Sequence, residues 1–159
     1  MKVLILEDNA ERRSAMEDRL KDRFPFCEIE FFTDAPTMIQ RVESAPLDDV
    51  ALISLDHDLE MLPGADVGAL VDPGTGVDVA EGLSRRKPVC LVIVHTTNTI
   101  GGDSMQEKLD ATGWTTLRVT PYGDLDWIDE MWFPAVRNSI VRDLPERSAA
   151  TQLERAREA

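Results

Sequence analysis

The sequence predicts an α/β fold: a doubly wound sheet of five parallel strands in the order 2-1-3-4-5, with helices on both faces. Short apolar runs alternate with longer amphipathic stretches along the chain, as in folds built from strand–helix–strand units. Three of the runs, the first, third and fourth, are continuously apolar, which is typical of strands buried on both faces. Placing these three at the centre of the sheet gives the predicted order. A chain of 159 residues is long enough for one such domain.

Each expected strand is a short run rich in apolar or β-branched residues. The second run differs from the others because polar and apolar residues alternate in it, as in a half-exposed edge strand. The five expected strands are residues 3–6, 27–32, 50–55, 89–94 and 114–119.

Helices are expected after each strand, where apolar residues recur every three or four positions. Asn9 and Asp34 are good N-cap residues for the first two helices, and Asp103 or Ser104 for the fourth. The first helix is expected over residues 10–23 and the third over 75–86, and the others contain residues 38–42, 105–109 and 127–140.

Two stretches lie outside this alternation. Residues 59–74 contain several Pro and Gly residues and predict an unusually long loop, of the kind that often forms a lid or a binding loop. The end of the chain is mostly polar. We therefore expect one domain over residues 1–142, followed by a polar tail over residues 143–159 that is helical or flexible.

Composition restricts the classes of function. The chain has 17 Lys and Arg against 30 Asp and Glu, a net charge of −13. Such an excess of acid argues against binding to duplex nucleic acid or to an anionic membrane, both of which need basic surfaces. The sequence has no apolar run as long as a membrane span and no signal peptide, so we expect a cytoplasmic protein. In that setting, Cys27 and Cys90 are expected to be small buried hydrophobic residues rather than disulfide or zinc partners.

Polar residues suited to chemistry follow the first, third and fourth strands. In open parallel sheets, ligands bind outside the carboxyl ends of the strands, so these residues are expected to converge. Both histidines of the chain are among them. The candidate site residues are Glu7, Asp8, Asp56, His57, Asp58, His95, Thr96 and Asn98.

The chain resembles a response-regulator receiver domain over about residues 1–142. The resemblance rests on the Leu-Glu-Asp-Asn run at residues 6–9, on Asp56 after the third strand and on Thr96 after the fourth. A receiver that accepts a phosphoryl group has a Lys directly before the Pro that follows the fifth strand. This chain has Thr120 there, before Pro121, which counts against a phosphorylation switch because that Lys pairs with the acyl phosphate.

Two motifs give a narrower resemblance, to the cyclic-phosphate processing receiver family. Residues 56–59 match its D-H-D-L motif, and residues 94–105 match its V-H-S-x-N-P-x-G-x-x-x-M motif. Thr96 replaces the Ser of the second motif and keeps its hydroxyl, whereas Thr99 stands in place of its Pro. The resemblance implies a flavodoxin-like, receiver-like fold and a phosphoesterase that hydrolyses a cyclic phosphate. The implied substrate is a small phosphorylated molecule such as a cyclic nucleotide, or an RNA 2′,3′-cyclic end.

An anionic substrate requires a cation in a site so rich in carboxylates. Carboxylates crowded together repel one another and the substrate, and a divalent cation relieves both effects. Mg²⁺ and Mn²⁺ suit carboxylate oxygens, and a histidine favours Mn²⁺. We therefore predict that Asp8 and Asp56 bind one Mg²⁺ or Mn²⁺, with Glu7 and Asp58 as further ligands or as residues that orient the ligands.

Opening a cyclic phosphodiester needs a base that activates water and an acid that protonates the leaving oxygen. Two histidines can fill both roles at neutral pH. We predict His95 as general acid or base, steadied by Thr96 or Asn98, and His57 as either its counterpart or a metal ligand. The amide of Asn98 can donate to a phosphoryl oxygen, and Arg12 or Arg13 can reach a phosphate.

Two other hypotheses stay open at this stage. One is a signalling receiver with Asp56 as phosphoacceptor, which Thr96 and the acidic pair favour and the missing Lys opposes. The other is a non-catalytic receiver-like interaction module. The sequence makes no prediction about the oligomeric state.

Overall fold

The computed structural model describes the backbone of residues 1–158 and the side chains of residues 1–145. Its main sheet has the strand order β2-β1-β3-β6-β7, and every neighbouring pair is parallel. Because β6 and β7 are the fourth and fifth strands of this sheet, the predicted order is confirmed. The strands are β1 (Lys2–Leu6), β2 (Glu28–Phe32), β3 (Val50–Leu55), β6 (Leu91–His95) and β7 (Thr115–Val119).

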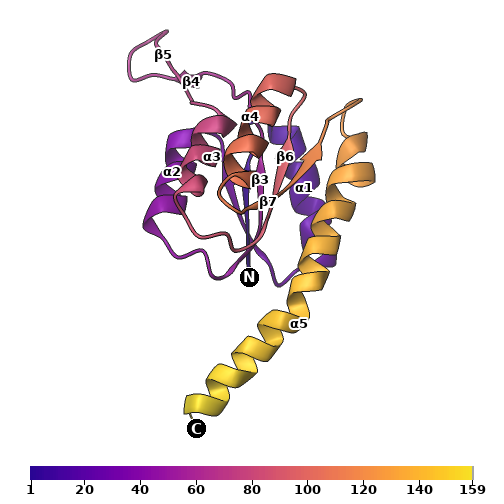
Figure 1. Cartoon of the computed structure of the whole chain (residues 1–159). Helices are drawn as coiled ribbons and strands as arrows, with labels where there is room; N and C mark the ends of the chain where they lie inside the picture. Colours follow the sequence, from indigo (N-terminus) through magenta and orange to yellow (C-terminus); the bar gives the residue numbers. More distant parts are fainter. Residues whose placement is uncertain (159) are drawn as a thin grey trace.

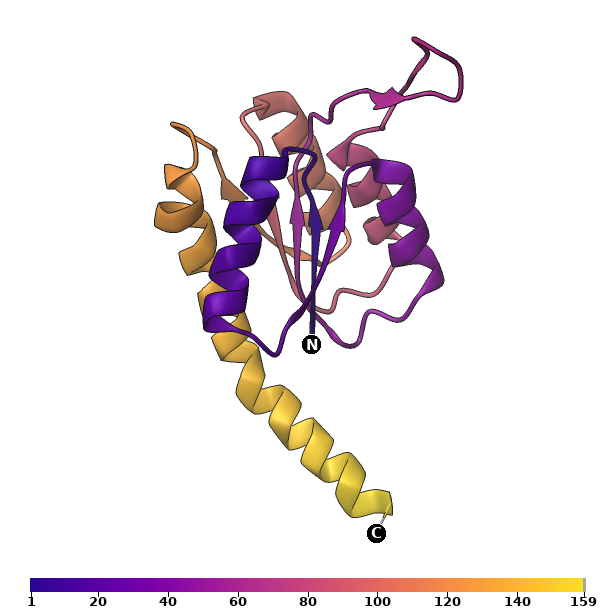
Figure 2. The ribbon, with the colours of Figure 1, turned by 180° about the vertical axis from the view of Figure 1, so that it is seen from behind.

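Helices cover both faces of the sheet (Figures 1 and 2). One face holds α1, together with the π-helical turn η1 and the helix α5 that continues from it. The other face holds α2, α3 and α4. The bounds are α1 (Ala10–Arg23), α2 (Ala35–Ser44), α3 (Gly76–Ser84), α4 (Thr99–Asp110), η1 (Ile128–Trp132) and α5 (Phe133–Glu158).

The apolar strands separate two hydrophobic cores. Val3 and Ile5 of β1 pack in the core under α1 and α5, whereas Leu4 and Leu6 pack in the core under α2, α3 and α4. All six residues of β3 are buried. This double burial explains why the central runs are continuously apolar, since neither face of those strands meets solvent.

The capping residues explain where three of the helices begin. Asn9 accepts a hydrogen bond from the backbone N–H of Arg12 at 3.0 Å, and Asp34 accepts one from Thr37 at 2.8 Å, as predicted. The prediction for α4 is wrong. Its N-cap is Asn98, which accepts from the N–H of Gly101 at 2.8 Å, and neither Asp103 nor Ser104 caps it. The sequence pattern did not indicate this helix start because the Gly101–Gly102 pair lies in the first turn, and glycine is a poor helix former.

The predicted long loop contains a small antiparallel hairpin of β4 (Leu62–Pro63) and β5 (Leu70–Val71). It projects from the domain at the end where the strands of the main sheet terminate (Figure 1). A bridge between Asp58 and Thr75 joins the two ends of the segment that carries the hairpin.

Three smaller expectations have different outcomes. Cys27 and Cys90 each lie one residue before a strand, where they are half-buried against the two cores. Helix α5 continues past the sheet as far as Glu158 (Figure 1), and the division at residue 142 stays a prediction. Over residues 1–158, no helix has the length and hydropathy needed to cross a membrane.

Candidate functional site

Three neighbouring strands bring Glu7, Asp56 and His95 together. Leu6 of β1 is paired with Leu55 of β3, and Leu55 with Val94 of β6, so the next residue on each strand lies at the same edge of the sheet. One potential ligand atom from each of the three side chains lies within 4.8 Å of the others. Glu7 and His95 have no exposed surface, and Asp56 is 5% exposed. We call these three residues the acidic cluster.

His95 is held by groups from β3 and from η1 with its N-cap residue Trp127. Its Nδ1 lies 2.8 Å from Oγ of Ser54, and the same oxygen accepts a hydrogen bond from the indole N–H of Trp132 at 2.9 Å. Its ring stacks on Trp127, with the centroids 5.7 Å apart and the planes 20° apart. This arrangement directs Nε2 toward Oε2 of Glu7, 3.3 Å away.

The two carboxyl groups of the cluster have pKa values shifted in opposite directions. Burial alone raises the pKa of Glu7, but His95, the N–H of Asn9 and Arg12 together lower it below its usual value. Burial raises the pKa of Asp56 to about 6, and the charge of Glu7 adds to this rise against the opposing effects of His95, the His57 N–H and Arg12. The two groups differ because Glu7 has a side-chain contact with His95 that opposes the effect of burial, whereas His95 acts on Asp56 through its charge alone.

Arg12 provides positive charge at the cluster. Its Nη1 lies 3.7 Å from Oε2 of Glu7 and 3.8 Å from Oδ2 of Asp56. The guanidinium carbon is also 5.6 Å from the centre of the Trp127 ring, within the range of a cation–π contact. Arg13 is turned elsewhere, because its Nη1 donates to the backbone carbonyls of Glu7 and Asp8.

The other predicted metal ligands lie outside the acidic cluster. The carboxylate of Asp8 accepts a hydrogen bond from the backbone N–H of Glu60, at the start of the hairpin segment. Both carboxylate oxygens of Asp58 lie 3.2 Å from the amide nitrogen of Asn98. Among the described side chains, the compact set of potential ligand atoms therefore comes from Glu7, Asp56 and His95. His95 takes the place in this set that the sequence analysis gave to Asp8.

The two histidines have different surroundings. His95 is fully buried, so in this conformation it does not reach a substrate, whereas the side chain of His57 is 14% exposed. The His57 ring packs directly on α4, and a Cβ on Gly101 would lie 2.3 Å from its Cδ2 atom. Its Nε2 is 3.7 Å from Asp58. The structure therefore gives the two rings separate positions, one inside the acidic cluster and one partly exposed beside α4.

Thr96 and Asn98 stabilise the loop between β6 and α4 rather than His95. Thr96 is 2% exposed, and its hydroxyl accepts a hydrogen bond from the N–H of Asn98 at 3.1 Å. The side-chain oxygen of Asn98 caps α4, while its amide nitrogen donates to Asp58. Ser54, which sequence reasoning missed, contacts His95 instead. A single hydroxyl within the otherwise apolar run 50–55 was the signal that could have indicated it.

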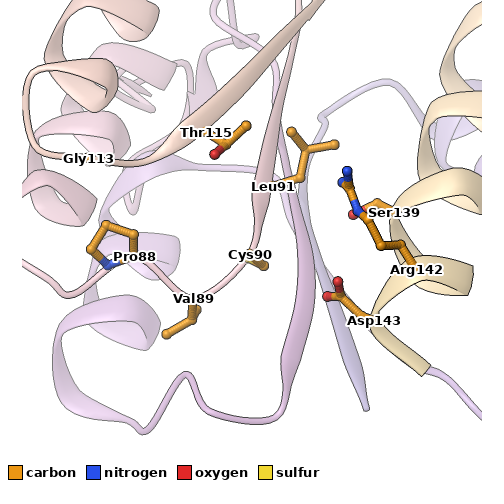
Figure 3. Close-up of a pocket in the computed structure, with 9 residues that line it drawn as sticks. All are labelled: Pro88, Val89, Cys90, Leu91, Gly113, Thr115, Ser139, Arg142 and Asp143. Atoms are coloured by element: carbon orange, nitrogen blue, oxygen red, sulfur yellow. The ribbon is translucent and has the colours of Figure 1, made fainter. Parts of the chain in front are cut away.

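A separate pocket lies at the opposite end of the sheet, where β6 and β7 begin (Figure 3). Arg142 and Asp143 of α5 face Cys90 and Leu91 across it. None of the predicted site residues lines this pocket.

The parallel sheet, its helical layers and the acidic groups at the ends of β1 and β3 define a receiver-type domain. Solved structures agree with this class. The response regulator domain of Thermotoga maritima CheB has a TM-score of 0.58 at 18% identity, over 88% of this chain and 96% of that one. The signal receiver domain of an HD domain-containing protein from Pseudomonas fluorescens Pf-5 has a TM-score of 0.61 at 14% identity, over 92% and 91%.

A third similar structure is the receiver domain of the sensor histidine kinase PA1611 from Pseudomonas aeruginosa PAO1, described with a magnesium ion coordinated in its active site cleft. Its TM-score is 0.55 at 16% identity, over 87% of this chain and 96% of that one. A comparison with curated proteins found no match. The chain belongs to the cyclic-phosphate processing receiver domain family, whose model matches residues 2–111.

Proposed function

We propose that this domain is a metal-dependent phosphoesterase that hydrolyses a cyclic phosphate. The observation that supports this proposal best is the acidic cluster, in which two buried carboxylates and an imidazole meet at the carboxyl ends of the parallel strands, where open sheets of this kind bind ligands. The family description, cyclic-phosphate processing, supplies the substrate class. The substrate would be a cyclic nucleotide or an RNA 2′,3′-cyclic end.

The acidic cluster fits a divalent cation. Oε2 of Glu7 and Nε2 of His95 are buried, face each other, and have no partner with hydrogen-bond geometry within the described part of the chain. Two carboxylates and one imidazole form a donor set that suits Mn²⁺, and Mg²⁺ less well. Asp8 and Asp58 lie on the same edge and would add oxygen ligands or orient bound water. When bound, the cation would neutralise the carboxylates and polarise a phosphoryl oxygen.

His57 is the proposed general acid or base, because it is the histidine with exposed surface. Its ring is held between Gly101 and Asp58, and its Nδ1 has no hydrogen-bond partner among the described residues. His95 is proposed as the imidazole ligand of the cation, with its ring held by Ser54 and Trp127, and not as the acid or base. In the reaction, a water oxygen would bond to phosphorus while one P–O bond of the ring breaks. The water loses a proton, the leaving oxygen gains one, and the product is a phosphomonoester.

A signalling receiver is the second candidate function. Asp56 directly follows β3 and Thr96 follows β6, and the three receiver domains described above share the fold. In that case Asp56 would accept a phosphoryl group. Against it stands Thr120, which replaces the Lys that pairs with the acyl phosphate. A non-catalytic interaction module would keep the fold and show neither chemistry.

A panel of 2′,3′-cyclic and 3′,5′-cyclic nucleotides, with Mn²⁺, with Mg²⁺ or with a chelator, tests the proposal, with acetyl phosphate assayed in parallel. We expect metal-dependent ring opening, which His57→Gln lowers by about a hundredfold and Arg41→Gln, far from the site, leaves unchanged. Labelling of Asp56 by acetyl phosphate without turnover would favour the signalling receiver. If neither activity is detected, the non-catalytic interaction module is the hypothesis that stands.

A further inference from the structure

We propose that Arg12 is an internal cation that occupies the acidic cluster and competes with a divalent metal ion for the carboxylates of Glu7 and Asp56. This inference rests on the proposed metal-dependent function and deepens it, because it concerns which positive charge occupies the same site before and after a metal ion binds. Arg12 is then neither a permanent structural partner of these carboxylates nor a passive surface residue.

The first support is the position of the guanidinium. Nη1 of Arg12 is nearly equidistant from Oε2 of Glu7, at 3.7 Å, and Oδ2 of Asp56, at 3.8 Å. These two carboxylates belong to the set of side chains that could hold a metal ion. The guanidinium therefore supplies, in part, the charge that a bound cation would supply. Both distances exceed those of a close hydrogen bond, so the contact is mainly coulombic.

The second support is that Arg12 can leave. Its side chain is 29% exposed and lies in the first turn of α1, whereas Glu7 is fully buried. Its contact with the Trp127 ring, 5.6 Å from the guanidinium carbon, is a face-on contact that does not enclose the group. Arg13, one residue later, is tied to two backbone carbonyls and has no such freedom.

The third support is electrostatic. A metal ion on Glu7 and Asp56 would place two positive groups against the same oxygens, in a buried site where charges are poorly screened. The two carboxylates cannot fully neutralise both groups. Metal binding is therefore expected to displace the guanidinium from the cluster, and part of the binding free energy of the metal is lost in this exchange.

Isothermal titration of Mn²⁺ into the 159-residue chain measures the competition. We expect Arg12→Gln to tighten Mn²⁺ binding about fivefold or more, because it removes the competing charge. Arg12→Lys keeps that charge and is expected to stay near the wild type. Arg19→Gln is the matched control: it removes the same charge from the same helix, but its guanidinium pairs with the exposed carboxylate of Asp129.

A second readout follows the arginine itself. Since Arg12 lies over Trp127, its departure is expected to change the fluorescence of that indole when Mg²⁺ is added. The change should be absent in Trp127→Phe, which keeps Trp114 and Trp132, and smaller in Arg12→Gln.

The outcomes separate this inference from the proposed function. If wild type and Arg12→Gln bind Mn²⁺ equally, or Arg12→Gln binds it more weakly, the competition is excluded while the metal site stands. If neither binds Mn²⁺ at millimolar concentration, both proposals fail. If Arg12→Gln binds Mn²⁺ and the wild type does not, the competition is supported in its strongest form.

Discussion

At the scale of single residues, burial explains most of what distinguishes this site. Sequence reasoning placed Glu7, Asp56 and His95 at neighbouring strand ends, and all three lie there. It did not indicate that His95 would be sealed from solvent, nor that Ser54 and Trp132 would hold its ring. These contacts join β3, β6 and η1. The spacing of residues along the chain does not predict contacts between side chains of three separate elements.

Asp56 gives a prediction about pH. Its pKa is raised to about 6, mainly by burial, above the usual 3.8, so the folded state favours the protonated carboxyl. The stability from this group is present below pH 4 and is lost as the pH rises through 6. Asp56→Asn, which mimics the neutral form, should therefore stabilise the chelator-treated protein at pH 8, by about 1–3 kcal/mol.

Urea unfolding of both proteins at pH 4 and pH 8 measures this difference, which should be small at pH 4. Glu7 has the opposite sign, because its pKa is lowered, and its stabilisation is lost as the pH falls. The same Glu7 is present in both proteins, so its own stabilisation is common to both, whereas its repulsion of the Asp56 carboxylate is absent from Asp56→Asn and is part of the expected gain. An Asn variant that is less stable than the wild type at pH 8 would contradict the assignment of burial as the dominant effect.

At the scale of elements, the start of α4 is built around two glycines that a helix would normally disfavour. A Cβ on Gly101 would lie 2.3 Å from the His57 ring, and a Cβ on Gly102 would overlap the guanidinium of Arg118. That guanidinium donates to the carbonyls of Thr96 and Asn98, at 3.2 Å and 2.9 Å. The absence of side chains at these two positions lets His57 and Arg118 pack against the helix backbone.

Gly101→Ala is therefore expected to destabilise the protein and to displace His57, although alanine ordinarily stabilises a helix interior by about 1 kcal/mol. Gly82→Ala in α3 is the matched control. Its Cβ would meet neighbours at 3.7–3.8 Å, an ordinary contact, so it should stabilise by about 0.5–1 kcal/mol. Thermal unfolding compares the two, and an equal gain in both variants would show that His57 is not confined by Gly101.

At the scale of the whole molecule, a net charge of −13 makes stability sensitive to bound cations. If the acidic cluster binds Mn²⁺, the folded state gains about 2.7 kcal/mol at a hundred times the dissociation constant. For a chain of this size, that gain raises the melting temperature by about 5–10 °C. Differential scanning fluorimetry with Mn²⁺, and with NaCl at equal ionic strength, separates specific binding from screening. A rise that Asp56→Asn retains in full would place the ion elsewhere.

The sequence by itself determined the fold class, the strand order, two of the three side-chain helix caps and the edge of the sheet where the polar residues meet. These features follow from local patterns: continuous apolar runs for β1, β3 and β6, and capping residues such as Asn9 and Asp34. Only the tertiary structure decided which of those polar residues touch. Asp8 accepts a hydrogen bond from the hairpin segment, and Asp58 accepts one from Asn98. Arg12 lies beside Glu7 and Asp56. The physical reason is that burial and contact are set by packing between distant segments, which neither spacing nor composition records.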